Sequence, residues 1–259
     1  MSSVLEHKWD VSPSGGDTAQ AAREREVRVA ISAAKTKRIL LCVVATLVIT
    51  GTAAGFVSKY VSPGPEHKLT KLMNRFDINH EPSIPAWYSS CALLVSSALL
   101  LLTGIARRQE RDRFCFHWFA LGAIFLWLSL DEAAMFHEGI NTALAYSQPE
   151  TEGLFYFPWV IPALIFVAIV GIWSIPFLRH IDRRTAAFFL VAGAVYVMGA
   201  VGMEMSAGPF VEKYGELSLP HMICEVIEET LEMLGIVIFI YALLDHLARC
   251  VPPIRLEVH

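Results

Sequence analysis

The chain is poor in charged residues and lacks the motifs by which most metal, nucleotide and nucleic-acid sites are recognised. Only 18% of its 259 residues are charged, the net charge is −4, and no basic stretch is interleaved with aromatic residues, which argues against nucleic acid as a partner. Its five cysteines form no C-x-x-C pair, so neither a disulfide framework nor a zinc ribbon is indicated. H-E-x-x-H and H-x-x-x-H are absent, as are haem, flavin and nucleotide motifs.

Apolar residues are abundant instead. They make up 54% of the chain, and the mean hydropathy of +0.48 is too high for an ordinary soluble domain. Six apolar segments are long enough to cross a hydrocarbon core of about 30 Å; they cover residues 39–61, 86–106, 114–138, 155–178, 185–205 and 221–248. The sequence therefore predicts an all-α, polytopic membrane helix bundle with six transmembrane helices.

Lysine and arginine set the expected orientation. Of the 21 basic residues, 7 lie in residues 1–38, 4 in 107–113, 3 in 179–184 and 2 in the C-terminal end. Because cytoplasmic loops carry the positive charges, both termini should be cytoplasmic, with the chain in the plasma (inner) membrane as a multi-pass protein. Three regions are expected: a polar tail over 1–38, a membrane domain over 39–250 and a short tail over 251–259. Part of the first tail, Thr18–Arg38, is either a basic amphipathic helix on the membrane surface or a solvated segment.

Ionisable residues cluster at the start of the sixth predicted span. At about 100° per residue they share an arc of about 100°; they are His221, Glu225, Glu228, Glu229 and Glu232. A carboxylate at the centre of a membrane helix costs roughly 2.5 to 3.5 kcal/mol, so such a stripe needs a functional or structural explanation.

The predicted orientation brings acids of two further spans to the same outer half of the membrane. The third span ends with Asp131, Glu132, His137 and Glu138, and the fifth carries Glu204 near its outer end. On a continuous helix Asp131 and Glu138 share a face, whereas Glu132 and His137 point about 140° apart. The four can reach one centre only if the helix end unwinds. The outer loop of residues 62–85 either caps this region or merely connects two spans.

No lysine or arginine partner is expected for these carboxylates, so protons, metal cations or a water-filled funnel must balance them. A carboxylate-rich set with two histidines favours a divalent metal such as Fe, Mn or Zn. We expect metal ligands among Asp131, Glu132, His137, Glu138, Glu204, His221, Glu225 and Glu228, with Glu229 and Glu232 as catalytic residues. Their chemistry is similar to that of di-iron carboxylate bundles, although the E-x-x-H pairs of those proteins are missing.

These residues predict a metal-dependent membrane enzyme, either a hydrolase or a di-metal oxidoreductase. Its substrate would be a lipid or another hydrophobic molecule that arrives from the outer leaflet. Three alternatives stay open: a proton- or cation-coupled transporter, an accessory subunit that packs its acidic face against a partner, and a purely structural network of buried acids. Membrane lipids are the expected surroundings, and the oligomeric state is open.

Overall fold

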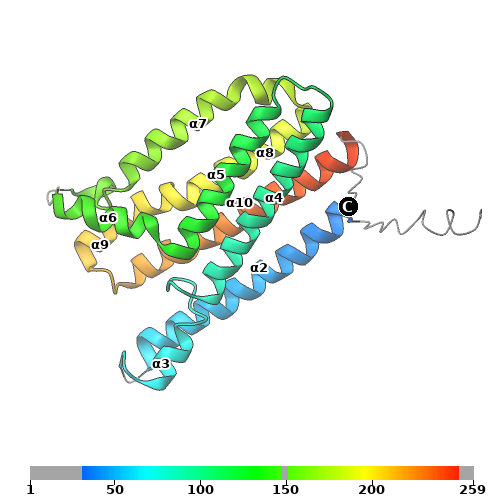
Figure 1. Ribbon diagram of the computed structural model, residues 1–259. Helices are drawn as coiled ribbons and strands as arrows, with labels where there is room; N and C mark the ends of the chain where they lie inside the picture. The colour runs from blue at the N-terminus through cyan, green and yellow to red at the C-terminus, as the bar shows by residue number, and fades with distance from the viewer. Residues whose placement is uncertain (1–30, 63, 148–150, 251–259) are drawn as a thin grey trace, which may run out of the picture. The chain divides into compact units, whose positions relative to one another are not determined.

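The computed structural model describes residues 31–62, 64–147 and 151–250, which contain helices and no β-strand (Figure 1). Its elements are α2 (Ala33–Phe56), η1 (Val57–Val61), α3 (Lys68–Met73), α4 (Ile84–Gln109), α5 (Cys115–Ala134), α6 (Phe136–Ser147), η2 (Gly153–Phe155), α7 (Val160–His180), α8 (Arg183–Val197), η3 (Met198–Met203), α9 (Glu204–Tyr214) and α10 (Leu219–Cys250). All belong to one unit that begins at Ser32. The predictions for residues 1–30 and 251–259 lie outside the described residues.

Among the described residues, five continuous helical stretches are long and apolar enough to cross a membrane, and a sixth results if α5 and α6 count as one bent span. Each predicted span has a helical counterpart. The third differs most, because the sequence predicts a single helix over 114–138 and the structure shows a break with a bend of 73° between α5 and α6. Met135 ends α5 in the left-handed region, with φ 54° and ψ 44°. That conformation cannot continue a right-handed helix, so the chain turns there.

The fifth predicted span, 185–205, is part of a longer helical stretch over Arg183–Tyr214. It starts as α8, widens into the π-helical turn η3 and continues as α9 from Glu204. A Cβ at Gly199 in η3 would lie 2.9 Å from the carbonyl oxygen of Glu228, and one at Gly235 in α10 would lie 2.9 Å from the backbone nitrogen of Tyr196. Glycine is therefore required for this stretch to approach α10 so closely.

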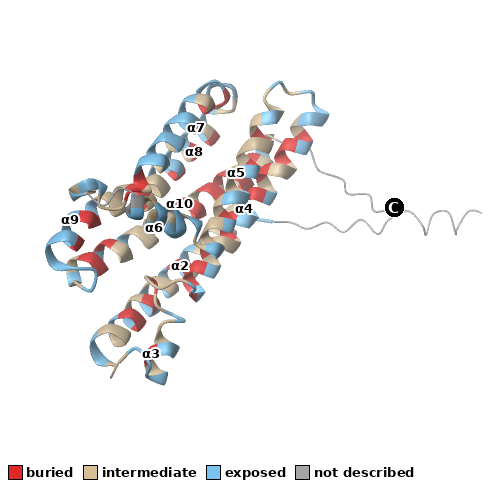
Figure 2. Ribbon diagram, turned by 60° about the vertical axis from the view of Figure 1, so that its left-hand side comes forward, coloured by how far each residue is buried: buried red, intermediate tan, exposed pale blue. Residues whose placement is uncertain are grey.

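Helix α10 is the central element. It packs against α2, α4, α8, η3 and α9. Between its acidic first half and its last turn it is apolar and tightly packed, with Met233, Val237 and Leu243 at most 1% exposed. Figure 2 shows buried residues on the packed helices, whereas α7 is exposed along most of its length. The core thus lies along α10, and it separates two polar regions at its ends.

Candidate functional site

The break between α5 and α6 brings His137 back to Asp131. The backbone N–H of His137 donates to Asp131 Oδ1 at 2.9 Å. The ring Nδ1 of His137 lies 3.1 Å from Asp131 Oδ2. Glu138 is more peripheral, because its side chain is 58% exposed and its Oε1 lies 3.9 Å from His137 Nε2. The end of α5 therefore unwinds, as is required for these residues to approach one another, and the break brings Asp131 into contact with His137.

Acidic residues of α5 and α10 face one another across the bundle. Glu132 interacts electrostatically with Glu229, and Glu232 interacts with both. The phenol of half-buried Tyr196 on α8 lies within electrostatic range of all three. Close packing at Gly199 and Gly235 places Tyr196 there. The two residues expected to be catalytic, Glu229 and Glu232, therefore lie within electrostatic range of one predicted metal ligand, Glu132.

Glu204 connects the helical stretch Arg183–Tyr214 to the same region. Its Oε1 accepts a hydrogen bond from Trp159 Nε1 at 3.3 Å, and its carboxyl group hydrogen-bonds that of Glu228 on α10. The ring of Trp159 also lies 5.4 Å from that of His137. A hydrogen bond between two carboxyl groups needs one proton. Glu204 and Glu228 together thus hold one proton and a net charge of −1 in this geometry.

Glu81, in the loop before α4, was not selected from the sequence. It interacts electrostatically with Glu132, Glu229 and Glu232, and burial raises the pKa of its carboxyl group above the ordinary value of 4.5. We call the following set the acidic centre: Glu81, Asp131, Glu132, His137, Glu204, Glu228, Glu229 and Glu232. The only signal for Glu81 in the sequence is its place in the longest outer loop, which is too weak to single it out.

Polar atoms near the acidic centre are buried without a hydrogen-bond partner among the described residues. They include Glu81 Oε2, His80 Nδ1 and Ser89 Oγ. Ser89 is 1% exposed and lies one turn before Leu93, which packs in one cluster with Ile236, itself one turn after Glu232. Because α4 and α10 run in the same direction (Figure 1), Ser89 lies at the depth of Glu232. Such atoms are expected where a site holds water or a ligand.

The remaining predicted ligands, His221 and Glu225, lie at the edge of this region. His221 Nδ1 lies 2.9 Å from the carbonyl oxygen of Glu216 and 3.7 Å from Glu225 Oε1. Glu225 interacts electrostatically with Lys59, at the end of the first helical stretch. The expectation that no lysine would approach these acids is wrong at this position, because η1 carries Lys59 toward α10.

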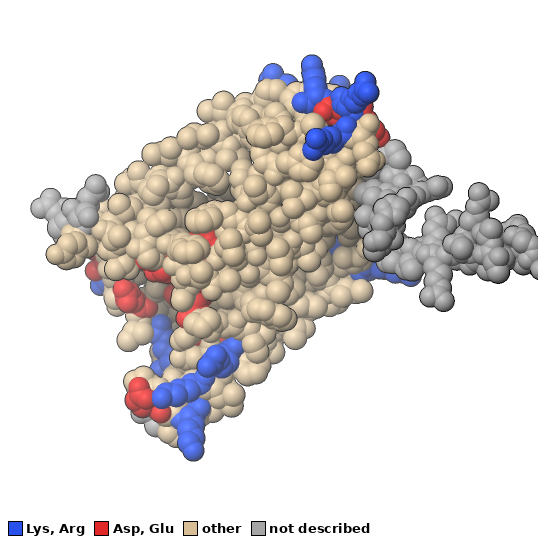
Figure 3. All heavy atoms as spheres, viewed as in Figure 1, with Lys and Arg blue, Asp and Glu red and all other residues tan. Residues whose placement is uncertain are grey.

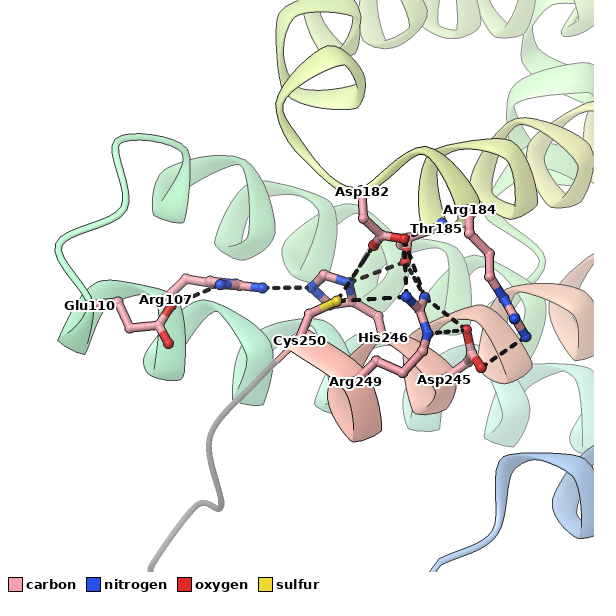
Figure 4. A network of polar contacts seen from close by, with 9 residues as sticks. All are labelled: Arg107, Glu110, Asp182, Arg184, Thr185, Asp245, His246, Arg249 and Cys250. Atoms are coloured by element: carbon pink, nitrogen blue, oxygen red, sulfur yellow. Dashed lines mark hydrogen bonds and ion pairs between the residues drawn. The ribbon is translucent and has the colours of Figure 1, made fainter.

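A second polar network joins the opposite ends of α4, α8 and α10 (Figure 4). His246, 1% exposed, lies at its centre, with Arg107 Nη2 3.2 Å from its Nε2 and Asp182 Oδ2 3.2 Å from its Nδ1. Arginine can only donate, so Nε2 accepts and the proton is on Nδ1. The full network comprises Arg107, Glu110, Asp182, Arg184, Thr185, Asp245, His246, Arg249 and Cys250.

Within this network Asp182, His246 and Cys250 each offer a ligand atom, and the three atoms lie within 4.8 Å of one another, so a metal ion could be held there. The sequence did not point to this triad. Its contacts show a different arrangement, in which Arg249 Nη2 lies 3.3 Å from Asp182 Oδ1 and the proton on His246 Nδ1 faces the same carboxylate. Protein cations already satisfy these groups. We interpret the network as a connection between helix ends.

The two polar regions differ in charge balance. In the second network, three carboxylates are paired with three arginines. The acidic centre contains seven carboxyl groups and one histidine, and Lys59 interacts electrostatically with Glu225 at its edge. Figure 3 shows acidic side chains gathered near the end of the bundle where α6 and α9 lie. The acidic centre is therefore the region whose carboxyl groups are not matched by basic side chains of the described residues.

Residues 40–247 match a family model described as a domain of unknown function, DUF8692. No match is found among curated proteins or among solved structures. The matched segment contains the whole acidic centre. Because it also covers most of the 259 residues, the chain belongs to the DUF8692 family.

Proposed function

We propose that the chain is a multi-pass plasma-membrane protein whose acidic centre binds one or two divalent metal ions, Fe, Mn or Zn, in the outer half of the bilayer. In this proposal α5 and α6 form one bent span, six spans cross the membrane, and both termini are cytoplasmic. The observation that carries it is the gathering of seven carboxylates and one histidine, from three helical stretches and a loop, in one region. Oxygen and imidazole ligands suit these metals.

Access to the acidic centre is from one side. Below Glu232, α10 continues with apolar residues that are almost completely buried, including Ile236, Val237 and Ile240 at 1–3% exposed. Three apolar clusters surround this part of α10. On the neighbouring α4, the buried hydroxyl groups of Ser96 and Thr103 donate to carbonyl oxygens of their own helix. A path for ions across this part of the bundle would need polar groups that are free to solvate them. A one-sided site favours an enzyme or a binding protein over a carrier.

The chemistry would be that of a membrane metalloenzyme. A bound metal supplies Lewis-acid activation of water or oxidative chemistry at a di-metal centre. Glu229 and Glu232 lie within electrostatic range of Glu132 and would accept a proton, while Asp131 holds His137 in place through two contacts. The substrate would be a lipid or another hydrophobic molecule from the outer leaflet.

Elemental analysis of detergent-purified protein tests this proposal. We expect metal in the wild type and loss of at least half of it in a Glu132→Gln/Glu229→Gln variant. Glu66→Gln is the matched control, because the side chain of Glu66 is 89% exposed and pairs only with Lys71. A folded wild type that contains no Fe, Mn or Zn after purification without chelators would contradict the proposal.

The hydrogen bond between Glu204 and Glu228 favours a second candidate, a proton-coupled carrier. Two carboxyl groups that share a proton are typical of proton relays in membranes. In proteoliposomes a carrier would give proton-dependent flux that Glu228→Gln abolishes. No flux is expected if the apolar stretch of α10 stays closed.

A further inference from the structure

Helix α7 is fixed at both ends and packs loosely between them. Val160 and Phe177 are 0% exposed. Between them Ser174 is also buried, but none of residues 161–173 is. At one end Trp159 contacts Glu204 and His137, and at the other the rings of Trp173 and Phe177 stack on His117.

One face of the loose stretch is directed at the bundle. Ala163, Val167 and Val170 are half-buried and lie on the same helix face as the buried Ser174 and Phe177. On the opposite face Ile165 is 57% and Ile172 is 69% exposed. In Figure 3 the surface is hollowed between the positions that α7 and α5 occupy in Figure 1. The inward face therefore borders a groove.

We propose that this groove holds one hydrocarbon chain of a membrane phospholipid, with the head group at the acidic centre. Residues 160–178 contain no charged side chain, so hydrocarbon rather than water fills the space inside a bilayer. Residues 161–173 extend over about 18 Å at about 1.5 Å per residue. This length is close to the depth of one leaflet, about 15 Å of hydrocarbon.

Trp159 fixes the direction in which the lipid lies. It forms the end of the groove and contacts both Glu204 and His137, so a head group above a chain in the groove reaches the acidic centre. The phosphate of a phospholipid can bind the metal ion of the proposed function, on which this inference rests. The hydrophobic substrate is then a phospholipid, and it enters the groove laterally from the outer leaflet.

Photolabelling of the purified full chain tests the inference. The probe is phosphatidylethanolamine with a diazirine near the end of one acyl chain, and peptide mass spectrometry locates the label. We expect labels on Ala163, Val167 or Val170 in addition to the outward residues. Labels confined to outward residues such as Ile165 and Ile172 would overturn the inference.

A pair of variants separates the groove from general lipid contact. Val170→Trp fills the groove, whereas Ile172→Trp places the same ring two residues away on the outward face. After detergent exchange, we expect wild type and Ile172→Trp to retain phosphatidylethanolamine and Val170→Trp to lose most of it. Equal retention in all three would overturn the inference. Metal content is measured in the same samples, and a metal-free wild type that retains the lipid contradicts the proposed function and leaves the groove supported.

Discussion

At the scale of single residues, Glu81 shows how position in space decides the role of a side chain. It belongs to a loop, yet its carboxylate interacts with Glu132, Glu229 and Glu232 on two helices. Burial raises its pKa, because an ionised carboxylate is costly away from water. Glu81 therefore adds a carboxyl group, whose ionisation burial opposes, to a centre that is already short of cations.

Glu81→Gln should change how the stability of the metal-free protein depends on pH. The folded-state pKa of Glu81 is raised above 4.5, so its contribution is fully present below about pH 4.5 and is lost as the pH rises through the raised value. We expect the variant to unfold at a higher temperature than wild type at pH 8 in EDTA, and the difference to vanish at pH 4. Thermal unfolding of Glu66→Gln is the control. The prediction fails if the two variants show the same pH dependence.

Asp182 shows the opposite shift. Burial alone would raise its pKa, but hydrogen bonds with Thr185 and His246 and the charge of Arg249 outweigh burial and lower it below 3.8. Asp182 also caps α8, where Thr185 donates its backbone N–H to Oδ1 at 3.1 Å. Its carboxylate thus links helix ends that would otherwise separate.

Asp182→Asn should destabilise the protein by about 1–3 kcal/mol at neutral pH, because charge-assisted hydrogen bonds are lost. A lowered folded-state pKa gives stability that is present above pH 3.8 and disappears as the pH falls through the folded value. The difference in unfolding free energy between variant and wild type should therefore become smaller as the pH falls below 3.8. Denaturant unfolding at pH 7 and pH 3 measures it, and a gap that stays constant would contradict the assignment.

At the scale of elements, the π-helical turn η3 brings Glu204 to α10. Its Gly199 packs against the backbone of Glu228 and Glu232 with no room for a methyl group. π-helical turns often occur at functional sites. Here the turn immediately precedes an acidic residue that contacts both Trp159 and Glu228.

Gly199→Ala should cost about 1–3 kcal/mol through overpacking and reduce metal binding, because α10 must move away from η3. Gly193→Ala is the matched control on α8. A Cβ at Gly193 meets no atom within 4 Å, and alanine favours the helix by up to about 1 kcal/mol. Unfolding and metal content are measured for both. Equal effects of the two substitutions would show that close packing at η3 does not support the acidic centre.

At the scale of the whole molecule, polarity is divided between the two ends of an apolar helix bundle. The acidic centre lies at one end of the core along α10, and the arginine-rich network lies at the other. In the proposed topology the arginine-rich end faces the cytoplasm, since basic residues are retained there.

Single-cysteine labelling in intact cells measures this orientation. We expect Glu66→Cys, in the loop before α3, to react with a membrane-impermeant maleimide. Arg111→Cys, in the turn between α4 and α5, should react only after permeabilisation. Each substitution is introduced into a variant of the protein in which the five native cysteines have been replaced by serine. The reverse pattern would invert the proposed topology.

The amino-acid sequence was sufficient to predict the helical, apolar class of the protein, and it showed that ionisable residues share one helix face between His221 and Glu232. Both follow from local properties, namely hydropathy over a helix length and the angle between successive side chains. It also indicated that Asp131, Glu132, His137 and Glu138 could meet only if their helix unwound. The sequence did not predict that the helix breaks at Met135, because a left-handed residue other than glycine has no local sequence signature.

Which polar groups meet depends on how the helices pack. Glu81, Tyr196 and Lys59 approach the acids of α10 through packing of segments far apart in the chain. Asp182, His246 and Cys250 likewise come from two helix ends that the sequence separates by more than sixty residues. Contacts of this kind depend on how helices pack, which is set by long-range steric fit, whereas helix formation and hydropathy are properties of neighbouring residues.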